Sequence, residues 1–272
     1  PAAGDILARP ISTAPQPGSF WASIPEALKL PLQGRGLKWL LACSMYGAVF
    51  MGFIFIIALM FAGTGGKLAP LLWFVLAFLG GSAAILVGLI FNYFRSCLWA
   101  VLSGEDEPQS VGEVGPAFIL NDLFKMGLML CAFLLALNAV TIIWLVKLAS
   151  FDLSTIVASP LVWLLVLFGS LYWPMGLGLA AVQTSPIAFW DFPRGIKFML
   201  GAPLEYAVLT IVGNATYWLP VFGIMILGIL GGPLVSFIAA IVLVGPPLAY
   251  SHAVQGALLA HIFRLRPELF EE

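Results

Sequence analysis

The sequence predicts an all-α fold, a polytopic transmembrane helical bundle, and three observations carry that prediction. Hydrophobic residues make up 61% of the 272 residues, whereas charged residues make up only 9%. Because soluble domains carry about 25% charged residues, this chain has too little charge to cover a globule with polar surface. The few charges bracket long uncharged runs, and the basic residues fall mostly on one side of the membrane that these runs imply.

The apolar runs predict six membrane spans, since one span requires about 20 mostly apolar residues. Charged residues enclose uncharged stretches of 28, 27, 21, 38 and 58 residues. Each of the first four holds one span. The last holds two, divided at the Gly- and Pro-containing segment 228–233, a turn signal. The predicted spans are 38–62, 70–94, 125–147, 154–181, 204–229 and 233–262.

The basic residues predict the orientation, because cytoplasmic flanks carry an excess of Lys and Arg. Lys67 and Lys147 lie on one face of the predicted bundle, and the other ten of the 12 basic residues lie on the opposite face. We therefore expect both termini to be cytoplasmic and the protein to lie in the bacterial inner membrane. Trp39 and Trp99, near inner ends of spans, are interpreted as part of an aromatic belt. The ten are Arg9, Lys29, Arg35, Lys38, Arg95, Lys125, Arg194, Lys197, Arg264 and Arg266.

A repeated pattern precedes the predicted hairpins. Segments 20–30 and 189–198 both contain Phe-Trp, then Pro, then an apolar residue followed by Lys, and segment 115–125 keeps the Pro and the closing Lys. We read three hairpin units, each preceded by an amphipathic interfacial helix. The units are 18–103, 111–183 and 185–264, which together form a membrane domain over 18–264. A Pro/Ala-rich cytoplasmic tail (1–17) and a C-terminal cytoplasmic tail (265–272) flank it.

The first interfacial helix has a start signal, because Ser23 and Glu26 have the spacing of a capping box. Trp21, Ile24 and Leu28 then share one helix face. By analogy with the third unit, the interfacial anchors are Trp21, Lys29, Trp190 and Lys197.

Small residues spaced four apart predict surfaces of close helix packing. They occur on the second and the sixth predicted spans. The residues are Gly80, Ala84 and Gly88 on the former and Gly245, Ala249, Ala253 and Ala257 on the latter.

Ionisable groups in the spans are few, and such groups mark function by default. Kinks at the prolines of spans four to six favour a polar pocket among Asn138, Asn214, Tyr250 and His252. His252 has two interpretations: an axial ligand to a haem or chlorin or a hydrogen-bond donor to a quinone, or a histidine bonded across helices. No catalytic residue set and no metal site is apparent, so we expect no enzymatic activity and assign no cofactor.

The six spans, the Pro-containing amphipathic segments and the closing sequence YSHAVQGALLAHIFRLRPE resemble a group of uncharacterised prokaryotic integral membrane proteins. That group forms a domain of unknown function and is loosely similar to Yip1-type membrane domains. The resemblance implies a six-helix membrane fold and transfers no functional residue.

The function that these observations favour is a non-enzymatic scaffold or accessory subunit of a larger membrane complex. Its expected partners are the lipid bilayer and other membrane-protein subunits. A net charge of −1 gives no basic field for nucleic acid. One alternative is a transporter or permease component for an uncharged or lipid-like substrate. A second alternative is a membrane subunit that binds a haem, quinone or pigment through His252.

Overall fold

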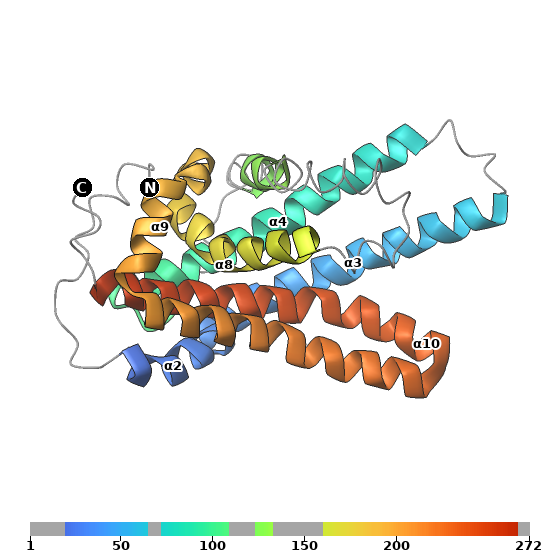
Figure 1. Ribbon diagram of the computed structural model, residues 1–272. Helices are drawn as coiled ribbons and strands as arrows, with labels where there is room; N and C mark the ends of the chain where they lie inside the picture. Colours follow the sequence, from blue (N-terminus) through green and yellow to red (C-terminus); the bar gives the residue numbers. More distant parts are fainter. Residues whose placement is uncertain (1–19, 65–71, 109–122, 133–159, 266–272) are drawn as a thin grey trace.

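The structure is a computed structural model that describes residues 20–64, 72–108, 123–132 and 160–265. Helix makes up 94% of these residues, and no strand occurs among them, so the all-α fold class is confirmed. The long helices run along the length of the molecule, and the short helices α2 (Phe20–Lys29) and α9 (Phe192–Gly201) lie at one end (Figure 1).

The first part of the chain forms a short helix, one 3₁₀ turn and two long helices. The second long helix ends at a Schellman motif, in which the Glu105 N–H donates to the Ala100 carbonyl (2.8 Å) and the Gly104 N–H donates to the Val101 carbonyl (3.1 Å). Gly104 adopts φ +73°, a conformation that costs glycine little. The four elements are α2 Phe20–Lys29, η1 Leu30–Leu32, α3 Gly34–Thr64 and α4 Leu72–Ser103.

The helix that contains the second predicted span does not end near residue 94, where that span is predicted to end. The helix continues through Arg95 to Ser103. An arginine does not end a helix, because its long stem can lie along apolar neighbours while the charged group reaches a polar region. The backbone of Gly104, rather than the first charge after the apolar run, ends α4.

In the second part of the chain, the structure describes the helical segment Leu123–Ala132 and then residues 160–265. Asp191 is the N-cap of the helix Phe192–Gly201, because its side chain accepts a hydrogen bond from the Arg194 N–H at 3.3 Å. The remaining elements are α8 Pro160–Val182, η5 Pro186–Trp190, α9 Phe192–Gly201 and α10 Pro203–Leu265.

Helix α10 consists of two arms that meet at Gly232. The φ of 79° and ψ of −177° at this glycine lie in a region that is almost restricted to glycine. The chain reverses there, so the first arm (203–231) and the second arm (233–265) lie side by side (Figure 1). The Ser251 hydroxyl joins the two arms by donating to the Gly213 carbonyl at 2.7 Å. The reversal falls inside the segment 228–233 in which the sequence predicts a turn.

Three helices in the described parts of the chain are long and apolar enough to cross a membrane: Gly34–Ile57, Ala77–Ser103 and Pro203–Gly232. Two shorter apolar helices, Leu123–Ala132 and Leu167–Val182, accompany them. Length and composition thus indicate a membrane protein with three candidate spans in the described parts of the chain. Most of the predicted span 125–147 lies outside the described residues.

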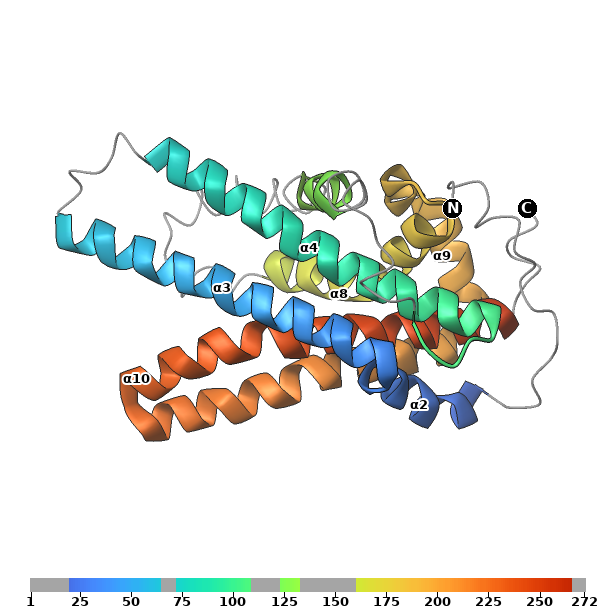
Figure 2. The same ribbon diagram turned by 180° about the vertical axis from the view of Figure 1, so that it is seen from behind.

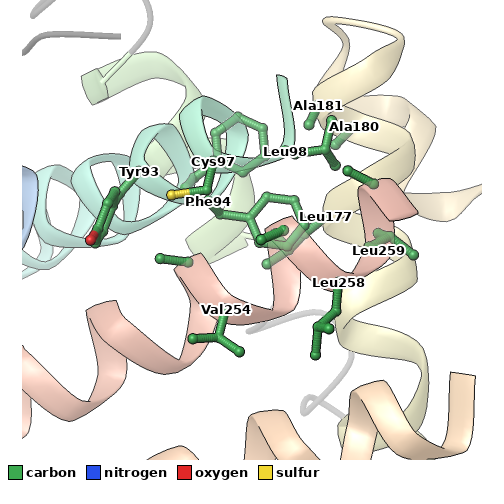
Figure 3. Packing of buried hydrophobic residues seen from close by; sticks show 14 of the residues in the cluster. Tyr93, Phe94, Cys97, Leu98, Leu177, Ala180, Ala181, Val254, Leu258 and Leu259 are labelled. Atoms are coloured by element: carbon green, nitrogen blue, oxygen red, sulfur yellow. The ribbon is translucent and has the colours of Figure 1, made fainter. Parts of the chain in front are cut away.

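The buried core lies toward the end of the molecule that holds α2 and α9. Figure 3 shows Phe94, Cys97 and Leu98 of α4 facing Leu177 of α8 and Val254 of α10. The second arm of α10 packs against α3, α4 and α8. Away from this end α3 and the arms of α10 diverge (Figure 2), and their large apolar side chains are exposed.

Two predictions about the first part are wrong. Ser23 does not begin α2, because the helix starts at Phe20 and the Ser23 hydroxyl donates back to the Phe20 carbonyl at 2.6 Å. Trp39 does not face lipid, because it is 2% exposed and stacks on Tyr93 with ring centroids 6.2 Å apart. In both cases the side chain turns toward the core instead of the surface that its residue type suggests.

Candidate functional site

The His252 side chain is held between two helices by both of its ring nitrogens. The indole N–H of Trp173, on α8, donates to Nε2 of His252, on the second arm of α10, at 2.8 Å. On the other side of the ring, Nδ1 lies 2.8 Å from the carbonyl of Leu248, one turn earlier in α10. The interpretation of His252 as a histidine bonded across helices therefore matches this geometry.

The indole donor determines the tautomer of His252. An indole nitrogen can only donate, so Nε2 of His252 must accept and carries no proton. The proton of the neutral ring then resides on Nδ1, which donates to the Leu248 carbonyl. Both nitrogens are occupied, and a haem or chlorin could bind Nε2 only by displacing Trp173.

A cavity of about 260 Å³ adjoins this pair. It is partly open rather than enclosed, and apart from the His252–Trp173 pair the described side chains that line it are apolar. Three helices and the segment Leu123–Ala132 contribute to the wall. The described lining residues are Val87, Ile90, Phe91, Leu130, Trp173, Leu177, Leu248 and His252.

The described residues of the predicted polar pocket make separate hydrogen bonds. The Asn214 side chain donates to the Thr210 carbonyl of its own helix at 2.8 Å. The Tyr250 hydroxyl donates to the Leu28 carbonyl of α2 at 2.8 Å, away from His252. Asn138 lies outside the described residues. Residues 250 and 252 are about 200° apart around a helix, so they face different neighbours.

Tyrosine hydroxyls on the long helices donate hydrogen bonds to carbonyls of the short helices. The sequence did not predict these bonds. Besides Tyr250, the Tyr93 hydroxyl of α4 donates to the Pro31 carbonyl of η1 at 2.7 Å. Carbonyls at helix C-termini have no intrahelical partner, so these hydroxyls satisfy acceptors at the end of the α2–η1 segment. The Tyr172 hydroxyl of α8 likewise donates to the Phe189 carbonyl of η5 at 2.9 Å.

The two Phe-Trp pairs have similar ring geometry. Phe20 and Phe189 are both buried. Each ring meets the following tryptophan edge-on, with centroids 5.9 Å apart for Phe20–Trp21 and 6.1 Å apart for Phe189–Trp190. Of the predicted anchors, Trp21, Lys29 and Lys197 are exposed and Trp190 is half-buried.

Ala84 and Gly88, two of the small residues on α4, lie against the segment Leu123–Ala132. A Cβ on Gly88 would collide with the Leu123 carbonyl, and a Cβ on Gly127 would collide with the Ala84 carbonyl. Gly80 differs, because a Cβ there would meet nothing within 4 Å. Contact along this face therefore covers Ala84 and Gly88 and stops short of Gly80.

The small residues on the second arm of α10 face inward. Ala249, Ala253 and Ala257 are fully buried. Gly245 crosses Gly47 of α3 so closely that a Cβ on Gly47 would lie 3.0 Å from the Cα of Gly245. The small residues thus allow α10 to approach α3 within the molecule.

Charged side chains join helices at the packed end of the bundle, where α2 and α9 lie. Glu107, which follows α4, lies beside the start of α3 and pairs with Arg35, with Nε and Oε2 3.8 Å apart. The Arg264 guanidinium donates to the Val101 carbonyl near the end of α4 at 3.2 Å. An anion at a helix N-terminus and a cation at a C-terminus both complement the helix dipole.

Within the described residues, no group of three or more His, Cys, Asp or Glu side chains could hold a metal ion. Comparisons with protein-family models, curated proteins and solved structures found no match for the chain. The resemblance to the uncharacterised six-helix family therefore stays a prediction.

Proposed function

We propose that this chain is a multi-pass protein of the bacterial inner membrane that crosses the bilayer six times, with both termini in the cytoplasm. Three described helices have the length and composition of spans. The turn at Gly232 lies at one end of the bundle, and α2, α9 and the end of α10 lie at the other (Figure 1). The division into three hairpin units belongs to this proposal.

The positions of the basic residues support this orientation. Lys29 ends α2, Arg35 and Lys38 begin α3, and Arg264 is in the last turn of α10. These elements meet at the packed end through the Arg264–Val101 contact and the contacts of α2 with α10. Because Lys and Arg favour the cytoplasmic side, we assign the packed end to the cytoplasm.

Within the membrane we propose a non-enzymatic role as a scaffold or accessory subunit. The observation that supports this proposal is how the polar side chains of the long helices are hydrogen-bonded. Many of those that the structure describes bond to backbone carbonyls or to each other, either one turn back in their own helix or across to a neighbouring element, so these groups are already satisfied by the protein and are not left to line a polar path. Examples are Ser44, Asn92, Tyr93, Tyr172, Tyr206, Thr210, Asn214, Tyr250, Ser251 and the Trp173–His252 pair.

The exposed helix faces are the surfaces on which lipids or partner subunits would lie. Large apolar side chains recur every four residues on α3 at Leu41, Met45, Val49 and Phe53, and all four are exposed. An apolar face of this length is unusual on a soluble monomer and typical of contact with lipid or another membrane protein.

The test is to extract the tagged protein from its native membrane in mild detergent and determine the mass composition and visible spectrum together. The proposal predicts other chains in fixed stoichiometry and no absorbance that depends on His252. A lone, colourless protein would contradict the accessory-subunit role. Visible absorbance that disappears in His252→Ala but persists in a Trp218→Ala control would instead support the cofactor-binding alternative.

The cavity beside Trp173 favours one second candidate, a transporter or permease component for a lipid-like substrate. Its apolar wall and volume of about 260 Å³ suit an uncharged, apolar molecule. A reconstituted protein that moves a fluorescent lipid between the leaflets of a vesicle would support this candidate. Activity equal to that of empty vesicles would remove it.

A further inference from the structure

We propose that the cavity between α4, α8 and the second arm of α10 holds an acyl chain of a bilayer phospholipid. The proposal rests on the membrane location proposed above. It does not depend on whether the protein is a scaffold or a transporter.

The side chains that line the cavity favour a hydrocarbon ligand. Val87, Phe91 and Leu177 present only carbon to the cavity. The one polar pair in the described wall is saturated, because the Trp173 N–H and both nitrogens of His252 already have partners. A polar ligand group placed here would lose its hydrogen bonds to water and gain none, so the wall excludes a headgroup.

The size of the cavity matches part of a chain. An apolar protein cavity of about 150 Å³ stays dry and binds benzene. The cavity described here, at about 260 Å³, would hold roughly ten carbon atoms on the same scale. A recess of this size open to a bilayer is therefore expected to contain hydrocarbon.

The position of the cavity favours the tail of the lipid over its headgroup. Val87, Ile90 and Phe91 all lie within the candidate span Ala77–Ser103. Tyr93 and Tyr250, which lie within a turn of the wall, donate to carbonyls of the α2–η1 segment, so the cavity lies in the half of the bilayer nearer the packed end. The hydrocarbon core is about 30 Å thick, and a cavity within a span in that half still borders acyl chains.

The experiment uses the full chain in vesicles of phosphatidylethanolamine and phosphatidylglycerol that contain a phosphatidylcholine with a mid-chain diazirine. After irradiation, labelled peptides are identified by mass spectrometry. We expect labelling of Phe91, Trp173 or Leu177 that saturates with probe concentration and falls at least fivefold with excess unlabelled phospholipid. Labelling of the exposed face of α3 around Val49 should rise without saturation, as for bulk lipid.

Two variants separate site binding from bulk contact. Val87→Phe places a larger side chain in the cavity and should abolish the saturable labelling, whereas Val49→Phe, the same change on the exposed face of α3, should not affect it. Saturable labelling that survives Val87→Phe would overturn the proposal. If Val87→Phe does not fold, the wild-type saturation curve decides, since cavity labelling that never saturates also overturns it.

Two further outcomes identify other causes of failure. Competition by an isoprenoid alcohol but not by phospholipid would overturn the acyl-chain assignment in favour of an isoprenoid ligand. Absence of labelling both in the cavity and around Val49 would show that the protein is not in the bilayer. That last result contradicts the proposed membrane location, whereas labelling around Val49 alone contradicts only the acyl-chain site.

Discussion

Individual hydroxyls explain how a short amphipathic helix stays attached to the bundle. The Tyr93 and Tyr250 hydroxyls donate to the Pro31 and Leu28 carbonyls, which lie near the end of the α2–η1 segment. A hydrogen bond of this kind contributes about 1 kcal/mol net. The two bonds come from different helices, so they fix the position of the segment against both α4 and α10.

Replacing these tyrosines with phenylalanine tests their role. Tyr93→Phe and Tyr250→Phe should each weaken docking of α2 by about 1 kcal/mol, seen as roughly fivefold faster hydrogen exchange in residues 20–32. Tyr217→Phe is the control, since the Tyr217 hydroxyl bonds to none of the described residues. Unchanged exchange in both variants would show that apolar burial of Phe20 and Ala27 alone holds the segment.

A second residue-scale prediction concerns the Trp173–His252 pair. Trp173→Phe leaves Nε2 of His252 without its donor, and we expect a loss of about 1 kcal/mol in the free energy of unfolding. In a double-mutant cycle with His252→Leu, the Trp173 substitution should cost less, because no acceptor is left unpaired. The measurement is unfolding in mixed detergent micelles. Additive effects of the two substitutions would contradict a direct bond.

At the scale of elements, close packing depends on glycines whose positions the sequence pattern identifies only in part. Gly80 and Gly88 share one face of α4, yet only Gly88 lies against a carbonyl of the neighbouring segment. Gly88→Ala should therefore destabilise the protein by about 2 kcal/mol or more, since rigid backbone must move. The loss should appear as a lower thermal unfolding temperature in detergent.

Gly80→Ala is the matched control for this prediction. It adds the same methyl group to the same helix in open space, and it should be neutral or stabilising by up to about 1 kcal/mol, because alanine favours helix. Equal destabilisation by both substitutions would show that helix flexibility rather than packing determines the effect.

The sequence predicts the elements better than their ends. The uncharged runs locate α3 and the two arms of α10, and the glycines at 228–232 locate the reversal. Arg95 does not mark the end of α4, because the helix ends only where Gly104 allows a positive φ. Ser23 fits a capping box by spacing, but it lies on the face that packs on the bundle.

The site was harder to predict because its contacts join distant segments. Trp173 and His252 are 79 residues apart, and no local pattern couples them. The predicted polar pocket combines residues 250 and 252, which are about 200° apart around a regular helix and therefore face different neighbours. The cavity itself depends on how three helices and the segment Leu123–Ala132 pack against one another, which periodicity does not specify.

For the whole molecule, the packing differs between the two ends. Tyrosine bonds, the Arg35–Glu107 pair and the bond from Arg264 to the Val101 carbonyl join elements at the packed end. At the other end the exposed apolar side chains include Leu230. In a bilayer lipid can cover such surfaces, so the helices there need no large protein core. This asymmetry parallels the predicted excess of basic residues on the cytoplasmic side.

The central claim is that the packed end faces the cytoplasm and the Gly232 turn faces the opposite side. Cysteines placed at exposed Glu26, Leu265 and Leu230 test it, with labelling of spheroplasts by a membrane-impermeant maleimide. Cys43 and Cys97 are buried, and the unsubstituted protein sets the background. We predict that Leu230→Cys reacts in intact spheroplasts, whereas Glu26→Cys and Leu265→Cys react only after the membrane is opened. Reaction of Glu26→Cys or Leu265→Cys in intact spheroplasts would contradict the account.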